Sequence, residues 1–221
     1  MSAIGGPAAI TSGLVLELDA GNVKSYQSGS TTWFDKSGNA RNGTLTNGPT
    51  FNTGSLGSIV FDGVDDYVTG SFSTLNDFTI SCYVKSNDIT SALRFYPIGL
   101  NFSGSAFGGG IWLGGSFAPA NTAGIYDGNT FITGSSGITT NTWTFVTVTR
   151  QSSTSTVYIN NSTPVQGSIS SNPIIQYTIG KRTDNNWPYN GNISLIQVYN
   201  RALSASEVQQ NFNATRARFG I

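Results

Sequence analysis

Short runs in which apolar and polar residues alternate recur along this 221-residue chain, separated by clusters of Gly, Asn, Asp and Ser. A period of two places successive side chains on opposite faces of a β-strand. In residues 78–84, Phe78, Ile80, Cys82 and Val84 share one face, which we expect to be core, and the other face is expected to meet solvent. Short strands separated by turn residues indicate an all-β sandwich. The clearest predicted strands are residues 14–18, 78–84, 143–148, 156–159 and 193–199.

One helix is predicted, near the end of the chain. Ser204 and Glu207 have the spacing of a capping box, in which both side chains accept hydrogen bonds from backbone N–H groups of the first turn. Val208 and Phe212 continue at helical spacing. The pattern predicts a short amphipathic helix over residues 205–214 that covers a sheet.

The chain has the length of one sandwich domain. Residues 1–10 are predicted to form a flexible or partner-docked arm, and residues 11–221 a single domain that includes the helix. Residues 100–142 are rich in Gly, which indicates tight bends or close backbone approach in the curved middle strands of a jelly roll.

Charged residues make up only 10% of the chain, against about a quarter in typical globular proteins. Eleven basic and eleven acidic residues cancel, so nucleic acid and anionic membranes are not expected partners. The single Cys82 is expected to be a small buried side chain, with a reactive thiol as the alternative. The first residues lack the features of a secretory signal, and no apolar run reaches membrane-spanning length, so we expect folding inside a cell.

Several segments together carry a resemblance to a known family. They are residues 13–19 (GLVLELD), 33–39 (WFDKSGN), 43–47 (GTLTN), 60–68 (VFDGVDDYV), 78–85 (FTISCYVK), 143–150 (WTFVTVTR), 157–160 (VYIN), 179–182 (IGKR), 189–193 (YNGNI) and 198–204 (VYNRALS). In this order, the chain from residue 12 to 215 resembles the laminin G-like family of the concanavalin A-like superfamily. The resemblance implies a two-sheet antiparallel jelly roll. Its members are usually noncatalytic adhesion, glycan-binding or particle-surface modules.

The chain is not expected to be an enzyme. It contains no His, which excludes mechanisms that use imidazole as a base or a metal ligand. Glycosidases need two carboxylates about 5 to 10 Å apart, and endoglucanases of similar fold take theirs from a Glu-x-Asp-x-Glu strand. Glu17 and Asp19 begin such a pattern, but residues 20–22 (AGN) follow where a second Glu is needed. The other glutamate, Glu207, is assigned to the helix cap.

Asp62, Asp65 and Asp66 lie within one short turn and form a candidate calcium site, because Ca²⁺ takes carboxylate, carbonyl and water oxygens. Asp35 is a further candidate ligand. The alternative is that Asx side chains here bond their own backbone in turns. The resembling family often carries an Asp-Glu pair in its late strand, where this chain has Ser-Leu at 194–195, and this departure weakens the metal assignment.

The loop around residues 184–190 places two aromatic rings among amide side chains, outside any strand pattern. Sugars bind through such pairings, since a CH-rich face stacks on a ring while amides and carboxylates bond the hydroxyls. Its candidate ligand-binding residues are Asp184, Asn185, Asn186, Trp187, Tyr189 and Asn190. The alternative is that both rings fold back onto the sandwich edge. Trp112, flanked by glycines, is a second candidate on a concave sheet face, with core packing as its alternative.

Three hypotheses follow: a glycan-binding module, a structural protein of a larger particle, and an enzyme remnant. Residues 18–51 are also similar to laminin G-like domains among phage structural proteins. This resemblance implies a noncatalytic virion-surface component, such as a head decoration, fibre or tail-associated protein, assembled in the host cytoplasm and with a surface glycan as ligand. The expected partners are other virion proteins and further copies of the chain, and a free-standing bacterial lectin or adhesin is the alternative. Removing residues 1–10 is expected to abolish particle association with little change in melting temperature.

Overall fold

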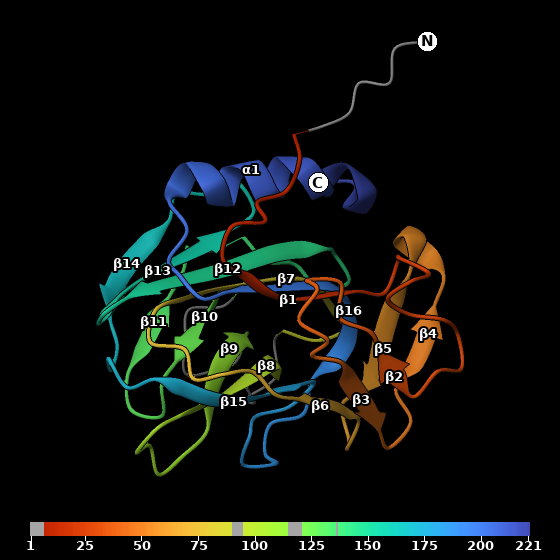
Figure 1. Cartoon of the computed structure of the whole chain (residues 1–221), viewed down its shortest axis with the longest axis horizontal. Coiled ribbons are helices and arrows are strands. Elements are labelled where there is room, and N and C mark those ends of the chain that lie inside the picture. Colours follow the sequence, from red (N-terminus) through yellow and green to blue (C-terminus); the bar gives the residue numbers. More distant parts are fainter. Residues whose placement is uncertain (1–6, 90–94, 115–120, 136) are drawn as a thin grey trace.

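The computed structural model describes residues 7–89, 95–114, 121–135 and 137–221. Figure 1 shows two sheets stacked face to face, with the helix on the outside of one of them. Sheet A contains, in spatial order, β14 (Val165–Ser168), β13 (Thr154–Ile159), β12 (Thr144–Gln151), β7 (Phe78–Ser86), β16 (Asn190–Tyr199), β5 (Ser58–Asp62) and β4 (Thr50–Asn52), with β1 (Leu14–Asp19) also beside β16. Sheet B contains β11 (Phe131–Thr133), β10 (Ala123–Tyr126), β9 (Gly109–Leu113), β8 (Phe95–Phe102), β15 (Ile174–Ile179), β6 (Tyr67–Gly70), β3 (Gly43–Thr46) and β2 (Thr32–Trp33).

All pairs of strands in the described ranges run antiparallel. The predicted fold, a two-sheet antiparallel jelly roll with one short C-terminal helix, is therefore confirmed. No helix in the described ranges is both long enough and apolar enough to cross a lipid bilayer.

The main core fills the space between the two sheets, and β7 shows how the sequence directs it. Phe78, Ile80, Cys82 and Val84 all belong to this core, as the alternating pattern predicts. Burial raises the pKa of the Cys82 thiol to about 12, so this cysteine is a structural apolar side chain rather than a nucleophile.

The opposite face of β7 was expected to meet solvent, and this expectation is wrong. Thr79, Ser81 and Tyr83 are all buried, because the C-terminal helix covers the outer face of sheet A. The Tyr83 ring stacks on Phe219 with centroids 3.8 Å apart. A second, smaller core therefore lies outside sheet A, beneath the helix.

Helix α1 (Ala205–Thr215) begins at the predicted capping box and runs into a short 3₁₀ helix, η2 (Arg216–Phe219). A further 3₁₀ turn, η1 (Gly54–Leu56), connects β4 to β5. The Ser204 side chain accepts a hydrogen bond from the backbone N–H of Glu207, and the Glu207 side chain accepts one from Ser204. Val208 and Phe212 point into the second core. The helix prediction is confirmed to within one residue at its C-terminal end.

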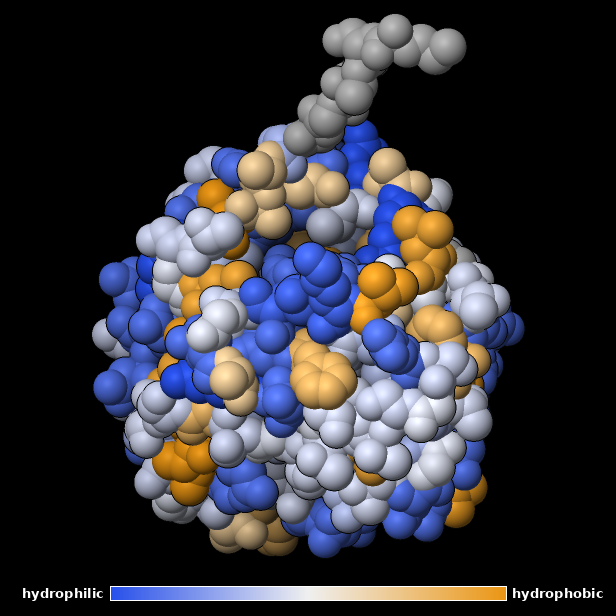
Figure 2. Space-filling view, turned by 45° about the vertical axis from the view of Figure 1, so that its right-hand side comes forward, coloured by the Kyte–Doolittle hydropathy of each residue, from blue (hydrophilic) through white to orange (hydrophobic). Residues whose placement is uncertain are grey.

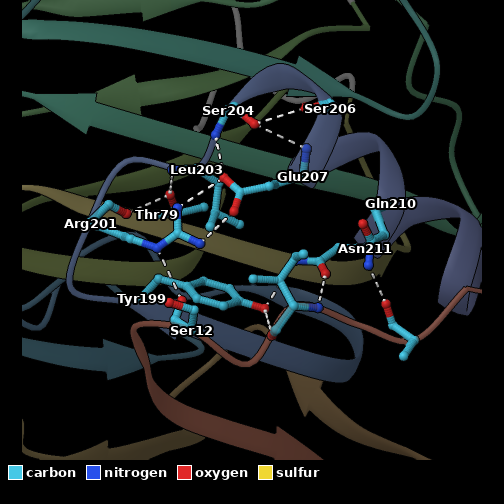
Figure 3. A network of polar contacts seen from close by, with 12 residues as sticks. Ser12, Thr79, Tyr199, Arg201, Leu203, Ser204, Ser206, Glu207, Gln210 and Asn211 are labelled. Atoms are coloured by element: carbon cyan, nitrogen blue, oxygen red, sulfur yellow. Dashed lines mark hydrogen bonds and ion pairs between the residues drawn. The ribbon is translucent and has the colours of Figure 1, made fainter.

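The segment before β1 is attached to this helix, as Figure 3 shows. The Gln210 side chain donates to the carbonyl of Ala8 at 2.7 Å, and the backbone N–H of Ile10 donates to Asn211 Oδ1 at 2.8 Å. The Tyr199 hydroxyl donates to the carbonyl of Ile10 at 2.9 Å. Ala8 and Ile10, which the predicted boundary after residue 10 assigns to the arm, are therefore hydrogen-bonded to the domain. A deletion of residues 1–10 removes contacts that hold α1, so the expectation of an unchanged melting temperature loses its basis.

Figure 2 brings the side of β2 and β4 forward and shows hydrophilic residues over most of that face. The apolar residues appear there as small separate patches, which is usual for the surface of a globular protein. This face of the molecule is therefore mostly polar.

Candidate functional site

The loop that connects β15 to β16, residues 181–188, is the candidate site and is called the Trp187 loop below. Its ends are closed by a hydrogen bond from the N–H of Tyr189 to the carbonyl of Gly180, 2.7 Å long. The Thr178 hydroxyl donates to the carbonyl of Lys181 at 2.6 Å and anchors the first residue of the loop on β15. In Figure 1 the loop extends below β15, on the side of sheet B that faces away from sheet A.

A glycine in β8 explains why the loop can lie against the sheet. Ile98 and Leu100 point into the core, so Gly99 between them faces outward. A Cβ at Gly99 would lie 2.3 Å from the carbonyl oxygen of Lys181 and 2.8 Å from the Cα of Arg182. Only a residue without a side chain therefore permits this approach of the loop to the outer face of sheet B.

Arg182 organises the loop through its guanidinium group. Its Nε and Nη2 donate to the two carboxylate oxygens of Asp184 at 2.9 and 2.5 Å, in a bidentate ion pair. The guanidinium carbon lies 5.6 Å from the ring centroid of Tyr96 and 5.8 Å from that of Trp187. Such cation–π and bidentate contacts fix a planar guanidinium in one orientation. Arg182 thus joins a carboxylate and an indole ring in one rigid unit.

The ion pair also keeps the Asp184 carboxyl group ionised. Burial opposes ionisation of Asp184, but the hydrogen bonds from Arg182 and Asn186 outweigh it and hold the pKa of this carboxyl below its ordinary value. Asp184 is therefore ionised at neutral pH, and the guanidinium neutralises it at close range. Lys181, whose ammonium lies 3.2 Å from the ring centroid of Tyr67, adds a positive charge at the start of the loop.

The predicted ligand residues of the loop fall into different environments. Trp187 is half-buried, in a left-handed backbone conformation with φ of 61°, and Asn185 and Asn186 are exposed. Asn190 is half-buried at the start of β16, where its Oδ1 accepts a hydrogen bond from Asn87 Nδ2 at 2.7 Å. The structure therefore brings Asp184, Asn185, Asn186 and Trp187 together in the loop and leaves Asn190 at its edge.

Tyr189 was predicted to contact ligand, but the structure places it in the core with 0% of its surface exposed. Its ring packs against Phe61, with centroids 6.3 Å apart. The chain has already returned to the sandwich at this residue, since its N–H closes the loop on Gly180. The alternative of folding back onto the sandwich holds for this ring.

Trp112 was also predicted as a ligand residue, and it is likewise fully covered, with 0% of its surface exposed. Its ring lies against Gly124 of the neighbouring strand, where a Cβ would be 2.8 Å from the indole, and makes an edge contact with Phe131. It fills the outer side of sheet B and offers no open ring face. Packing, the alternative stated for this residue, is its role.

The carboxylates predicted to bind calcium are partly brought together. Ligand oxygens of Asp62, Asp65 and Asp66 lie within 4.8 Å of one another. Burial, followed by the charges of Asp62 and Asp65, raises the pKa of Asp66, although a hydrogen bond from the backbone of Asp62 acts in the other direction. Asp62 also accepts a hydrogen bond from the N–H of Val64, as in an Asx-turn. Calcium at this turn stays a prediction.

Asp35 does not belong to this group. Its carboxylate accepts hydrogen bonds from the backbone N–H groups of Glu17, Ser37 and Arg41, and from the Ser37 hydroxyl. These bonds tie β1 to the following turn, so the Asx-turn that was the alternative for Asp35 is what the structure contains.

With this geometry established, the sequence can be placed among known proteins. The model of the laminin G-like family, described as the concanavalin A-like lectin/glucanases superfamily, matches residues 62–209. The chain belongs to this family. No curated protein matches the chain at a significant level.

Solved structures resemble the laminin G-like domain in fold. Trypanosoma rangeli sialidase in complex with sialic acid superimposes with a TM-score of 0.72 at 16% identity, covering 96% of this chain but only 35% of the sialidase chain. The binding domain of Paraclostridial Mosquitocidal Protein 1 gives a TM-score of 0.66 at 21% identity, covering 91% of this chain and 52% of that one. Domain 4 of a Geobacillus stearothermophilus extracellular arabinanase, in complex with arabinotriose, gives 0.65 at 17% identity, covering 90% and 98%. At these identities the similarity shows the fold alone.

Sequence reasoning missed two residues of the site, Tyr96 and Arg182. A local signal exists for one of them, because Arg182 and Asp184 are two positions apart in a loop that also holds an aromatic residue. Tyr96 comes from β8, which is far from the loop in sequence, and only the fold brings it to Arg182.

Proposed function

We propose that the laminin G-like domain is a noncatalytic glycan-binding module whose contact surface is the Trp187 loop. The observation that carries this proposal is the Arg182 guanidinium, which holds Trp187 and Asp184 in fixed positions beside two exposed amide side chains. An aromatic ring next to amide and carboxylate oxygens is the arrangement that recognises sugars. Because the ring and the carboxylate are held before the ligand arrives, binding loses less conformational entropy.

The Arg182–Asp184 ion pair favours neutral sugars over acidic ones at this point of the loop. Asp184 engages the Nε/Nη2 edge of Arg182, so this edge is not available to pair with a sugar carboxylate. Asp184 in turn remains able to accept hydroxyl donors, since a carboxylate has more than two acceptor positions.

One further observation supports a noncatalytic role, and the similar solved structures support binding of a sugar. Asp19 forms an ion pair with Arg218 at 2.6 Å, and Glu17 accepts a hydrogen bond from Gln197 at 2.9 Å, so the carboxylates that begin a glucanase-like pattern are engaged in structural contacts. The arabinanase domain with arabinotriose is a sugar-bound domain of this fold, and the mosquitocidal protein fragment is a binding domain. The ligands of those two proteins guide the choice of ligands to test on this domain.

The test is a glycan array probed with the wild-type domain and with Trp187→Ala. We expect binding to a neutral glycan that the variant loses. Phe34→Ala is a matched control, because Phe34 is an exposed aromatic residue, 45% accessible, in the β2–β3 connection. Retention of binding by Trp187→Ala, or equal loss in the control, would contradict the proposal.

We also propose that this module is located on the surface of a virion. There it would assemble with other particle proteins and with copies of itself. The support is the resemblance of residues 18–51 to laminin G-like domains among phage structural proteins. A free-standing bacterial lectin or adhesin is the competing proposal. Mass spectrometry of purified particles from cells that carry the gene distinguishes the two, since only the virion proposal expects the chain in stoichiometric amounts.

A further inference from the structure

Three loops meet at one end of the sandwich and enclose a hollow of about 430 Å³. They are residues 103–108 between β8 and β9, residues 127–130 between β10 and β11, and residues 169–173 between β14 and β15. The hollow is lined by residues of all three loops. None of its residues was singled out in the sequence.

A buried carboxylate holds two of these loops together. Asp127 is only 4% exposed. Its Oδ1 accepts hydrogen bonds from the backbone N–H groups of Asn129 at 2.9 Å and Thr130 at 2.6 Å, and its Oδ2 accepts one from the N–H of Ser170 at 2.6 Å. The turn after β10 is thereby fixed to the segment before β15.

A buried guanidinium also binds the loop between β14 and β15, residues 169–173. Arg150 of β12 is 0% exposed, and its Nη1 donates to the carbonyls of Ser170 at 3.0 Å and Asn172 at 2.7 Å. Burying two charged groups is costly unless hydrogen bonds compensate them. Both groups direct those bonds to the backbone of surface loops, so the shape of the hollow is fixed in the absence of a ligand.

The side chains around the hollow have the chemistry of a sugar site. Phe107 is 59% exposed, and Asn129 and Asn172 are exposed beside it in the lining. The one charged group of the lining, Asp127, already accepts three hydrogen bonds from the backbone. The hollow therefore offers an aromatic ring, amides and hydroxyls, and a neutral, hydroxyl-rich ligand is the class that these groups match.

The β8–β9 loop, which forms one wall of the hollow, also touches the Trp187 loop. Gly108 follows Phe107, and a Cβ at Gly108 would lie 2.4 Å from Thr183 Oγ1 and 3.2 Å from the backbone nitrogen of Asp184. The β8–β9 loop and the Trp187 loop are thus in direct contact, and in Figure 1 both extend from the same end of the molecule, below β15.

We infer that the hollow is a second subsite for the ligand of the Trp187 loop, and that the ligand class is a linear neutral oligosaccharide long enough to contact both. This inference rests on the proposed function. It adds that Phe107 stacks on a sugar unit distant from the one at Trp187, so affinity rises with chain length until both rings are engaged.

The test measures the affinity of the disaccharide and the hexasaccharide of the neutral cello-, xylo- and arabino- series by titration calorimetry. We expect the wild-type domain to bind one hexasaccharide more tightly than its disaccharide. Phe107→Ala should weaken the hexasaccharide about tenfold and leave the disaccharide unchanged. Trp187→Ala should weaken both. Phe107 is exposed, so its replacement is not expected to impair folding, and Asn172→Ala provides a second variant on the opposite wall.

Three outcomes would overturn the inference, and they bear differently on the proposed function. If the wild type and both hollow variants bind the hexasaccharide with equal affinity and Trp187→Ala loses this binding, the hollow is not a second subsite. The proposed function is unaffected by that result. Loss in Phe107→Ala without any loss in Trp187→Ala shows a hollow that acts alone and contradicts both. No binding of any of these oligosaccharides contradicts the inference, whereas the proposed function is then decided by the glycan array.

Discussion

Replacing Arg150 with methionine keeps the length and apolar stem of the side chain and removes its guanidinium. The group donates hydrogen bonds to the carbonyls of Asn76, Ser170 and Asn172, and more weakly to that of Leu75. Leu75 keeps another donor, the N–H of Ile174 at 3.0 Å. Three carbonyls therefore lose their partner in the variant.

The magnitude follows from these three carbonyls. A buried acceptor left without a partner costs about 1–3 kcal/mol. Asn76 and Asn172 are exposed residues, so water can replace the guanidinium at part of the site, and the lower figure applies. Removing a buried charge also relieves its desolvation, which is evident in the pKa of Arg150, lowered to about 10 mainly by burial. We expect Arg150→Met to reduce the free energy of unfolding by about 3 kcal/mol, or the melting temperature by roughly 6–12 °C.

Urea unfolding followed by tryptophan fluorescence measures this change, with Arg216→Met as the control because Arg216 is an exposed arginine of η2. The control should stay within about 0.5 kcal/mol of wild type. An Arg150→Met domain as stable as the control would refute the reasoning, since it would mean that the loop carbonyls need no protein donor. The same variant should weaken hexasaccharide binding, because Arg150 holds one wall of the hollow.

Two further predictions concern acid stability and calcium. The hydrogen bond from Arg201, together with that from the N–H of Ser204, lowers the pKa of Glu207 from 4.5 to about 2. A lowered carboxyl pKa contributes stability that is present above pH 4.5 and is lost as the pH falls toward 2. The melting temperature of the wild type should therefore fall more steeply over this window than that of Glu207→Gln, and parallel curves would contradict the assignment. If Asp62, Asp65 and Asp66 bind calcium, excess Ca²⁺ should raise the melting temperature and Asp62→Asn should abolish the rise; an unchanged wild-type melting temperature would exclude the site.

The strands and the helix were predictable because their signals are local. The alternation in β7 and the capping box at Ser204 need only neighbouring residues to be recognised. The solvent-facing side of β7 was mispredicted because its cover, α1, begins more than a hundred residues later in the chain. Burial of an outer face depends on what the rest of the chain places there, and alternation carries no information about it.

The site was harder to predict because its residues depend on contacts distant in sequence. Tyr189 has similar polar neighbours in sequence to Trp187, yet its ring lies in the core against Phe61, which is distant in sequence. Trp112 is covered on a face that the glycine pattern suggested was open. Arg150 ends a recognisable strand motif, but its acceptors include a carbonyl 74 residues away. Asp184, Asn185 and Asn186 have only local partners, and they lie in a loop outside the strands, as the sequence indicated; their role in ligand binding stays a prediction.

The measurement that tests the central claim most directly is a titration of the ¹⁵N-labelled domain with a glycan selected on the array, observed at the indole N–H signals of its four tryptophans. Trp33 and Trp112 are fully covered and Trp143 is 7% exposed, so these three serve as internal references, whereas Trp187 is half-buried in the loop. The proposal predicts that the Trp187 signal moves in a saturable manner while the other three stay in place. Saturation of binding with the Trp187 signal unmoved would contradict it.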